Sequence, residues 1–190
     1  MRAAPSTVAF VAFVGTLAST STVRAEPEWN LAARTSLCGL GDRGAVRHRT
    51  GFCGSLRGDL LLGRERNADF ALGPYATFGT ATFSDVRFGG GLSLLLPTLS
   101  GDFPIVLSAG ALSRNGNDVR LSADAFFGLR SHNFHGAYAM ASGLVIGADS
   151  AVAGGHGNTL YVGLQVDGLW IALPFILGYE WLHRAPDPGD

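Results

Sequence analysis

The five histidines are the first residues to consider for chemistry, because imidazole is a common general base and metal ligand. They are His48, His132, His135, His156 and His183. A hydrolytic histidine works with a nucleophile and with an acid that orients it. Neither His48 nor His156 has a serine and an acid at a spacing that strands would bring together. We therefore interpret the histidines as solvent-exposed loop residues and predict no catalytic site, no cofactor and no metal centre.

Two glycine-rich stretches could suggest phosphate-binding loops. They are "GGG" at 89–91 and "GGHG" at 154–157. A phosphate loop leads into a helix and supplies a lysine, and neither stretch does so. We interpret the first as a kink in a strand and the second as a flexible loop, since a glycine inside a strand often marks a bend.

Cys38 and Cys53 are the only cysteines. Two cysteines this far apart lack the close C-x-x-C spacing of a zinc site, and His48 between them does not supply it. In an exported chain such a pair is a candidate disulfide. Closing a loop of about 15 residues is worth roughly 3 kcal/mol in the chain-entropy model. We predict that Cys38 and Cys53 are bridged.

The start of the chain has the form of a secretory signal peptide. Arg2 is followed by an apolar run from Val8 to Leu17 and by small residues that end at Ala25. A run of roughly 10 apolar residues is too short for a membrane-spanning helix, which needs about 20. We predict a signal peptide at 1–25 and one domain at 26–190. Removing Arg2 and Arg24 leaves 14 − 2 = 12 basic and 15 acidic residues, a net charge of −3 that gives no indication of nucleic acid binding.

Period-two alternation of apolar and polar residues recurs along the mature chain and predicts strands. Turn residues separate eight candidates of about ten residues each, which match tilted transmembrane strands better than the shorter strands of most soluble proteins. They are 29–38, 52–61, 69–78, 86–96, 104–113, 119–131, 137–147 and 159–168. The fold class we predict is all-β, an antiparallel up-and-down transmembrane β-barrel.

The apolar segment 169–182 has three possible forms. It contains Pro174 and could be a further strand, a helix packed at the membrane interface, or the true closing strand. An additional strand would make nine, whereas single-chain bacterial barrels have even numbers. The sequence therefore leaves the number of strands open, within one or two of eight.

The alternating residues indicate whether the polar side chains line the interior of the barrel or its outer surface. In "VRLSADAFFGLRS" (119–131) one parity is apolar and the other carries Arg120, Asp124 and Arg130. The chain has no lysine, and arginine suits desolvated pairs with carboxylates. Small residues on the polar parity leave room for arginine in a narrow interior. We predict that the polar parity lines the barrel, with interior charges at Arg57, Asp59, Arg87, Arg120, Asp124 and Asp167.

The lengths of the loops and the positions of the aromatic residues predict what lies at each end of the barrel. The longest connections, 39–51 and 148–158, fall at one end, and "SHNFHG" (131–136) would be a short turn at the other. Outward aromatic residues near strand ends would form interfacial girdles, with plain packing as the alternative. They are Trp29, Phe52, Phe70, Phe78, Phe88 and Tyr138. Cys38 and Cys53 would face inward at the mouth of the barrel.

Together these features resemble small eight-stranded bacterial outer-membrane β-barrels over nearly the whole mature chain. The resemblance implies an exported, monomeric protein whose partner is the outer-membrane bilayer, with a structural or surface-interaction role. Such barrels usually end on a strand with a terminal aromatic, whereas this chain continues past its last strand.

Two other functions stay open. One is a lipid A-modifying barrel enzyme, which would depend on His48 or His156. The other is a soluble, lipocalin-like periplasmic barrel with an apolar ligand inside. A pore is disfavoured, because side chains just fill the interior of an eight-stranded barrel.

Overall fold

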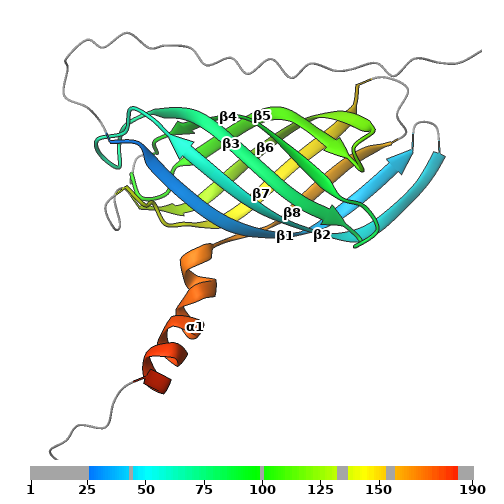
Figure 1. The fold of residues 1–190 in the computed structure, drawn as a ribbon. Helices are drawn as coiled ribbons and strands as arrows, with labels where there is room; N and C mark the ends of the chain where they lie inside the picture. The colour runs from blue at the N-terminus through cyan, green and yellow to red at the C-terminus, as the bar shows by residue number, and fades with distance from the viewer. Residues whose placement is uncertain (1–25, 43–44, 99–100, 132–136, 153–156, 184–190) are drawn as a thin grey trace, which may run out of the picture.

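The computed structural model describes residues 26–42, 45–98, 101–131, 137–152 and 157–183. The predicted signal peptide lies outside these residues. Eight strands and one helix make up the fold (Figure 1). They are β1 (Glu28–Asp42), β2 (Ala45–Leu61), β3 (Ala71–Ala81), β4 (Arg87–Leu96), β5 (Ile105–Arg114), β6 (Asp118–Arg130), β7 (Ala141–Ala151), β8 (Asn158–Asp167) and α1 (Gly168–His183).

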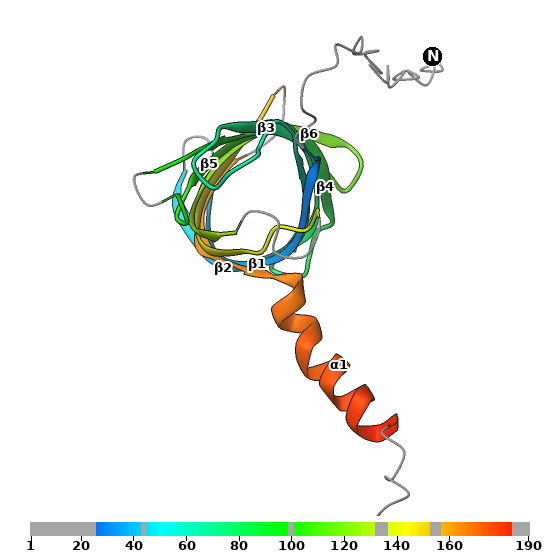
Figure 2. The same ribbon diagram turned by 90° about the vertical axis from the view of Figure 1, so that its left-hand side faces the viewer.

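Each strand pairs antiparallel with the next, and β1 also pairs with β8, so that the sheet closes into a barrel. The predicted eight-stranded antiparallel barrel is confirmed. Closure gives each strand a neighbour on both sides in the body of the barrel and so removes its open edges. Viewed towards the end of the barrel, the strands form a ring (Figure 2).

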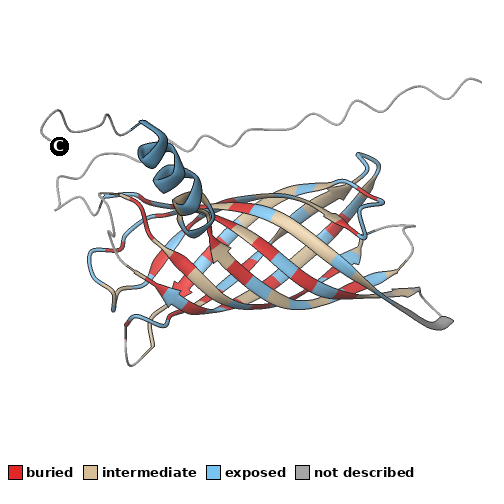
Figure 3. Ribbon diagram, turned by 90° about the horizontal axis from the view of Figure 1, so that it is seen from below, coloured by how far each residue is buried: buried red, intermediate tan, exposed pale blue. Residues whose placement is uncertain are grey.

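Burial alternates along the strands, as Figure 3 shows in its bands of red and pale blue. On β6 the side chains of Val119 and Leu121 are exposed on the outside, whereas Arg120, Asp124 and Arg130 are buried. Successive strand residues point to opposite faces of the sheet. The polar parity of 119–131 therefore faces the interior, and the apolar parity faces outward.

The two ends of the barrel differ in their connections. The end that holds the start of β1 and the end of β8, here called the terminal end, carries connections 62–70, 97–104 and 131–140. The opposite or distal end carries the shorter connections 43–44, 82–86, 115–117 and 152–157. The longer connections thus lie at the end where the sequence predicts short turns.

The predicted long loops at 39–51 and 148–158 are wrong, as is the predicted short turn at 131–136. Most of 39–51 belongs to β1 and β2, where Gly39 pairs with Thr50 and Cys38 with Gly51. β7 continues to Ala151. Glycines and charges indicate turns in sequence, but here hydrogen bonds to the neighbouring strand hold these residues in extended conformation. The stretch 131–136 belongs to the longer connection 131–140, and residues 132–136 lie outside the described residues.

The C-terminal segment takes the helical form among the three predicted. α1 follows β8 without a loop, and Asp167 caps it by accepting a 2.8 Å hydrogen bond from the backbone N–H of Leu169. In the part of the chain that the structure describes, no helix combines the length and the apolar character needed to cross a membrane.

Candidate functional site

The interior of the barrel is the candidate site, because it gathers charged side chains at its centre. Arg57, on β2, is 1% exposed and donates to Asp59 Oδ1 at 2.7 Å and to Asp124 Oδ2 at 3.0 Å. It also donates to the hydroxyls of Ser93 and Ser108, each at 2.6 Å. One guanidinium thus joins β2, β4, β5 and β6. We call these five residues the central cluster.

Two further side chains complete the surroundings of the central cluster. The ring of Tyr75 lies with its centroid 3.9 Å from the guanidinium carbon of Arg57, a cation–π contact. Arg34 donates to Asp124 at 3.3 Å and to Gln165 at 2.7 Å. Every charged group of the cluster therefore meets a charge or a hydrogen bond, as burial in a low dielectric requires.

An apolar layer lies next to the central cluster on the terminal side. Leu61, Leu95 and Phe126 each come two residues after a member of the cluster on strands that run towards the terminal end. They pack with Ala71, Val106 and Ala141 in one buried hydrophobic group. Beyond this layer, Arg64 donates to Glu28 at 3.0 Å, with both side chains fully buried.

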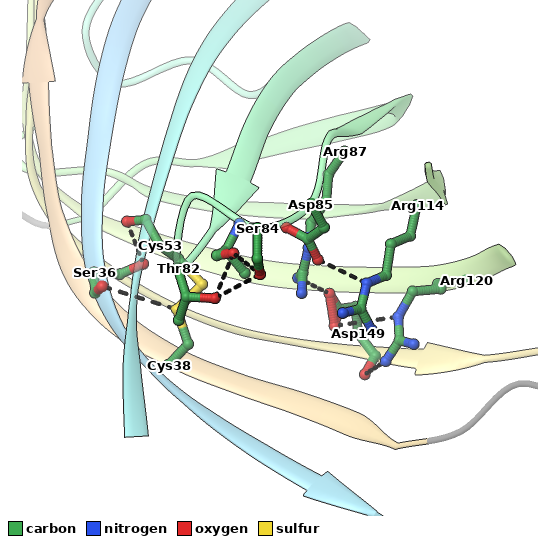
Figure 4. The surroundings of a disulfide bond; sticks show 11 residues. Ser36, Cys38, Cys53, Thr82, Ser84, Asp85, Arg87, Arg114, Arg120 and Asp149 are labelled. Atoms are coloured by element: carbon green, nitrogen blue, oxygen red, sulfur yellow. Dashed lines mark hydrogen bonds and ion pairs between the residues drawn. A yellow bond between two sulfur atoms is a disulfide. The ribbon is translucent and has the colours of Figure 1, made fainter. Parts of the chain in front are cut away.

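A second ion-pair group lies at the distal end (Figure 4). Arg87 donates to Asp85 Oδ2 at 3.1 Å and to Asp149 Oδ2 at 2.9 Å. Arg114 reaches Asp85 at 2.7 Å, and Arg120 lies 3.6 Å from Asp149. We call these five residues the distal cluster. It ties the turn 82–86 to β5, β6 and β7 across the mouth of the barrel.

Asp85 stands outside the strands, in the turn 82–86. Burial alone would raise the pKa of this carboxyl, but a hydrogen bond from the N–H of Ala81 and the charges of Arg87 and Arg114 outweigh burial and lower the pKa. Asp85 is therefore held as a carboxylate that fixes its turn.

Asp167, at the end of β8, is the centre of a third polar group. Its carboxylate accepts hydrogen bonds from Asn30 Nδ2 at 2.7 Å, Tyr138 Oη at 2.5 Å and Ala141 N at 2.9 Å. Burial and this hydrogen bond raise the pKa of Tyr138. The prediction of Tyr138 as an outward girdle residue is wrong. It precedes β7, so the parity of a strand does not apply to it, and its hydroxyl turns inward to Asp167.

A cavity of about 80 Å³ lies between the central and distal clusters. Arg34, Arg57, Arg87, Tyr75 and Tyr161 are among the residues that line it. Gly147 makes room for the ring of Tyr161, since a Cβ atom there would lie 2.4 Å from the ring. A polar space of this size accommodates a few water molecules.

The predicted disulfide is confirmed: Cys38 and Cys53 are bridged, with their Cα atoms 6.0 Å apart. Cys38 is buried inside the barrel, and the bridge joins β1 to β2 beside the turn that carries Thr82 and Ser84 (Figure 4). It crosslinks the longest hairpin of the sheet close to the distal cluster.

The structure places all six predicted interior charges within the barrel. Arg57, Asp59 and Asp124 come together in the central cluster, Arg87 and Arg120 meet at Asp149, and Asp167 stands apart at the terminal end. Parity places Ser93 among the small inward residues of its strand, and it could also have found Ser108 on the inward face of β5. Sequence reasoning missed Asp85 and Asp149, because both lay in stretches that read as turns or loops.

The structure gives no test of the predicted absence of catalysis. The side chains of His48, His132, His135 and His156 lie outside the described residues, and His183 is exposed at the end of α1. In the described ranges, no group of three or more His, Cys, Asp or Glu residues could hold a metal ion.

No protein-family model and no curated protein matches the chain. Among solved structures, the chain is similar to the solution NMR structure of the de novo designed TMB2.3. The match has 16% sequence identity and a TM-score of 0.41, and it covers 74% of this chain and 96% of the designed one. A likeness of this degree has no bearing on function.

Proposed function

We propose that the protein is an exported β-barrel inserted in the bacterial outer membrane. Its role there is structural or concerns interactions at the membrane surface, and it carries no catalytic site. Its partner is the lipid bilayer, and it acts as a monomer. The observation that carries the proposal is the inverted distribution of polarity, with charges inside the barrel and apolar side chains outside.

The outward apolar side chains come from every strand, and many are more than half exposed. One outward leucine from each strand, in chain order, is Leu37, Leu56, Leu72, Leu92, Leu107, Leu121, Leu144 and Leu160. Soluble monomers rarely expose contiguous apolar patches larger than a few hundred Å². A belt of this kind around a closed barrel is expected where hydrocarbon surrounds the strands.

Aromatic side chains gather at both ends of the barrel. Trp29, Phe70, Phe103 and Phe127 are exposed at the terminal end, and Phe52, Phe78, Phe83 and Phe88 at the distal end. The rings of Phe52 and Phe83 stack with centroids 5.9 Å apart, which extends the distal group from β2 onto the turn 82–86. Two such groups support the proposal, because aromatic girdles mark the two interfaces of membrane barrels.

The filling of the interior favours a structural role over transport. The apolar layer and the central cluster lie across the barrel one above the other, as expected when eight strands enclose a space just wide enough for side chains. A soluble barrel that binds an apolar ligand needs the opposite arrangement. The cavity in this barrel is lined by Leu112 and Val145 but also by three arginines and two aspartates, which an apolar ligand would leave without solvent.

Heat-modifiability tests this proposal. Protein from the outer-membrane fraction is run on SDS gels with and without boiling. The proposal predicts that the unboiled sample migrates faster, because the closed barrel survives in detergent. Recovery in the soluble periplasmic fraction with no mobility shift would contradict the proposal.

A further inference from the structure

The helix α1 is apolar on all sides, and among the described residues it contacts little beyond the strands β1 and β8 from which it departs. Its only residues with ionisable side chains other than Tyr179 are Glu180 and His183, both near its C-terminal end. None of its residues is buried, and Phe175, Leu177, Trp181 and Leu182 are among the most exposed. A helix that is hydrophobic all round is stable only where its whole circumference is covered.

The point at which α1 leaves the barrel lies inside the apolar belt. Asp167, the last residue of β8, pairs with Ala32, so β1 continues beyond β8 through residues 28–31. Beyond the end of β8, residues 137–139 take its place beside β1, where the backbone of Trp29 hydrogen bonds to Ala137 and Ala139. The first residue of the helix, Gly168, therefore lies beside Leu31, whose side chain is exposed on the outer surface.

The direction of α1 is across the barrel axis. In Figure 1 it runs away from the wall, with a slant towards the terminal end, and in Figure 2 it radiates outward from the ring of strands. A helix of 16 residues is about 24 Å long, shorter than the roughly 30 Å of a hydrocarbon core. Its direction and its length both suit a position within one leaflet.

We propose that α1 lies in the plane of the bilayer, within the hydrocarbon of the leaflet at the terminal end, and enlarges the footprint of the barrel in that leaflet. This inference rests on the proposed membrane insertion of the barrel. Lipid is the molecule that covers the surface of α1. Acyl chains can surround a helix on every side, whereas a second copy of the chain would cover only one face. The apolar surface of α1 is continuous with Leu31 and the belt around the strands.

The ends of α1 suit this position. Asp167 accepts the Leu169 N–H at the start of the helix, and His183 Nδ1 lies 3.0 Å from the carbonyl oxygen of Tyr179 at its end. Free backbone groups are costly in hydrocarbon, so such partners matter there. The slant brings the C-terminal end of α1 closer to the terminal end of the barrel (Figure 1). Glu180 and His183 belong to that end of the helix, and there charged side chains can reach the headgroups.

Tryptophan fluorescence tests the inference, because the chain has three tryptophans: Trp29 on the belt, and Trp170 and Trp181 on α1. Two variants keep one tryptophan each, Trp181 in W29F/W170F and Trp29 in W170F/W181F. Each is folded into phosphatidylcholine vesicles with and without brominated acyl chains. The gel mobility of each variant confirms that its barrel has closed.

The inference predicts that brominated acyl chains quench Trp181 at least as strongly as Trp29, which lies at the interface, and that aqueous iodide quenches Trp181 no more than Trp29. Quenching of Trp29 by bromine together with quenching of Trp181 by iodide would overturn the position of α1 and leave the inserted barrel intact. Trp181 shielded from both quenchers in a protein that crosslinks as a dimer would assign the helix to a second copy. Iodide quenching of both tryptophans, with no quenching of either by brominated acyl chains, would contradict membrane insertion itself.

Discussion

At the scale of residues, Arg57 holds the centre of the barrel together. Replacing it by alanine leaves Asp59 and Asp124 buried without their main partner, and breaking a buried ion pair costs about 3–5 kcal/mol. We expect R57A to lower the free energy of unfolding by that amount, measured by urea titration of the protein in lipid vesicles.

The matched control for this variant is R114A. The side chain of Arg114 is 35% exposed at the mouth of the barrel, where an ion pair is worth about 1 kcal/mol or less. Equal losses in R57A and R114A would show that the buried network contributes no more than a surface pair.

The lowered pKa of Asp85 predicts a dependence of stability on pH. An unfolded carboxyl titrates near 3.8, so the stabilisation by Asp85 is complete above that pH and is lost as the pH falls through the lower folded value. We expect D85N to be less stable than the wild type at neutral pH, with a difference that shrinks below pH 3.8. Measuring the free energy of unfolding of both proteins between acidic and neutral pH gives this difference. A difference that does not vary with pH would contradict a lowered pKa of Asp85.

Strand parity predicts individual interior residues well wherever a residue belongs to a strand. Arg57, Asp59 and Asp124 follow from alternation alone, because a side chain has only two faces to choose from. Parity fails for Tyr138, which precedes its strand. It also does not reveal that Asp85 turns inward from a loop, since that placement depends on cations contributed by β4 and β5.

At the scale of elements, the disulfide stabilises the hairpin of β1 and β2. The bridge closes a sequence separation of 15 residues, and the chain-entropy model assigns about 3 kcal/mol to such a loop. We expect C38S/C53S to lower the free energy of unfolding by about that amount, since the constraint on the unfolded chain is gone. Urea titration under oxidising conditions measures this. Reducing agent should destabilise the wild type similarly and leave the variant unchanged.

Asp167 joins three elements, because it ends β8, caps α1 and holds Asn30 on β1. A hydrogen bond to a charged group is worth about 1.5–3 kcal/mol, and D167A removes several at once. We expect a loss of about 3 kcal/mol or more in the free energy of unfolding. D102A, at an exposed carboxylate, is the control and should change it little. A loss in D102A as large as in D167A would contradict this role.

The existence and order of the eight strands could be predicted, since each carries its own alternation. Their ends could not, because glycines 39, 41 and 51 suggest a loop until the ladder between β1 and β2 is seen. The form of the segment 169–182 also could not be predicted. Its residues are apolar on every side and so have neither the period of a strand nor that of an amphipathic helix.

At the scale of the whole molecule, the barrel inverts the usual arrangement of a soluble protein. Four layers follow one another inside it: the Glu28–Arg64 pair, the apolar group around Phe126, the central cluster and the distal cluster. The outer surface carries leucine, isoleucine, valine and aromatic side chains. Such a barrel is stable only if hydrocarbon surrounds its strands.

One substitution tests the nature of that solvent most directly. Ile146 lies near the middle of β7 with its side chain on the outer surface. In hydrocarbon an outward arginine near the midplane costs about 2–4 kcal/mol, whereas in water it would cost almost nothing. N117R, in an exposed turn at the distal end, is the control and should be close to neutral. In lipid vesicles, I146R is predicted to lower the free energy of unfolding by about 2–4 kcal/mol. An unchanged or increased stability of I146R would contradict it.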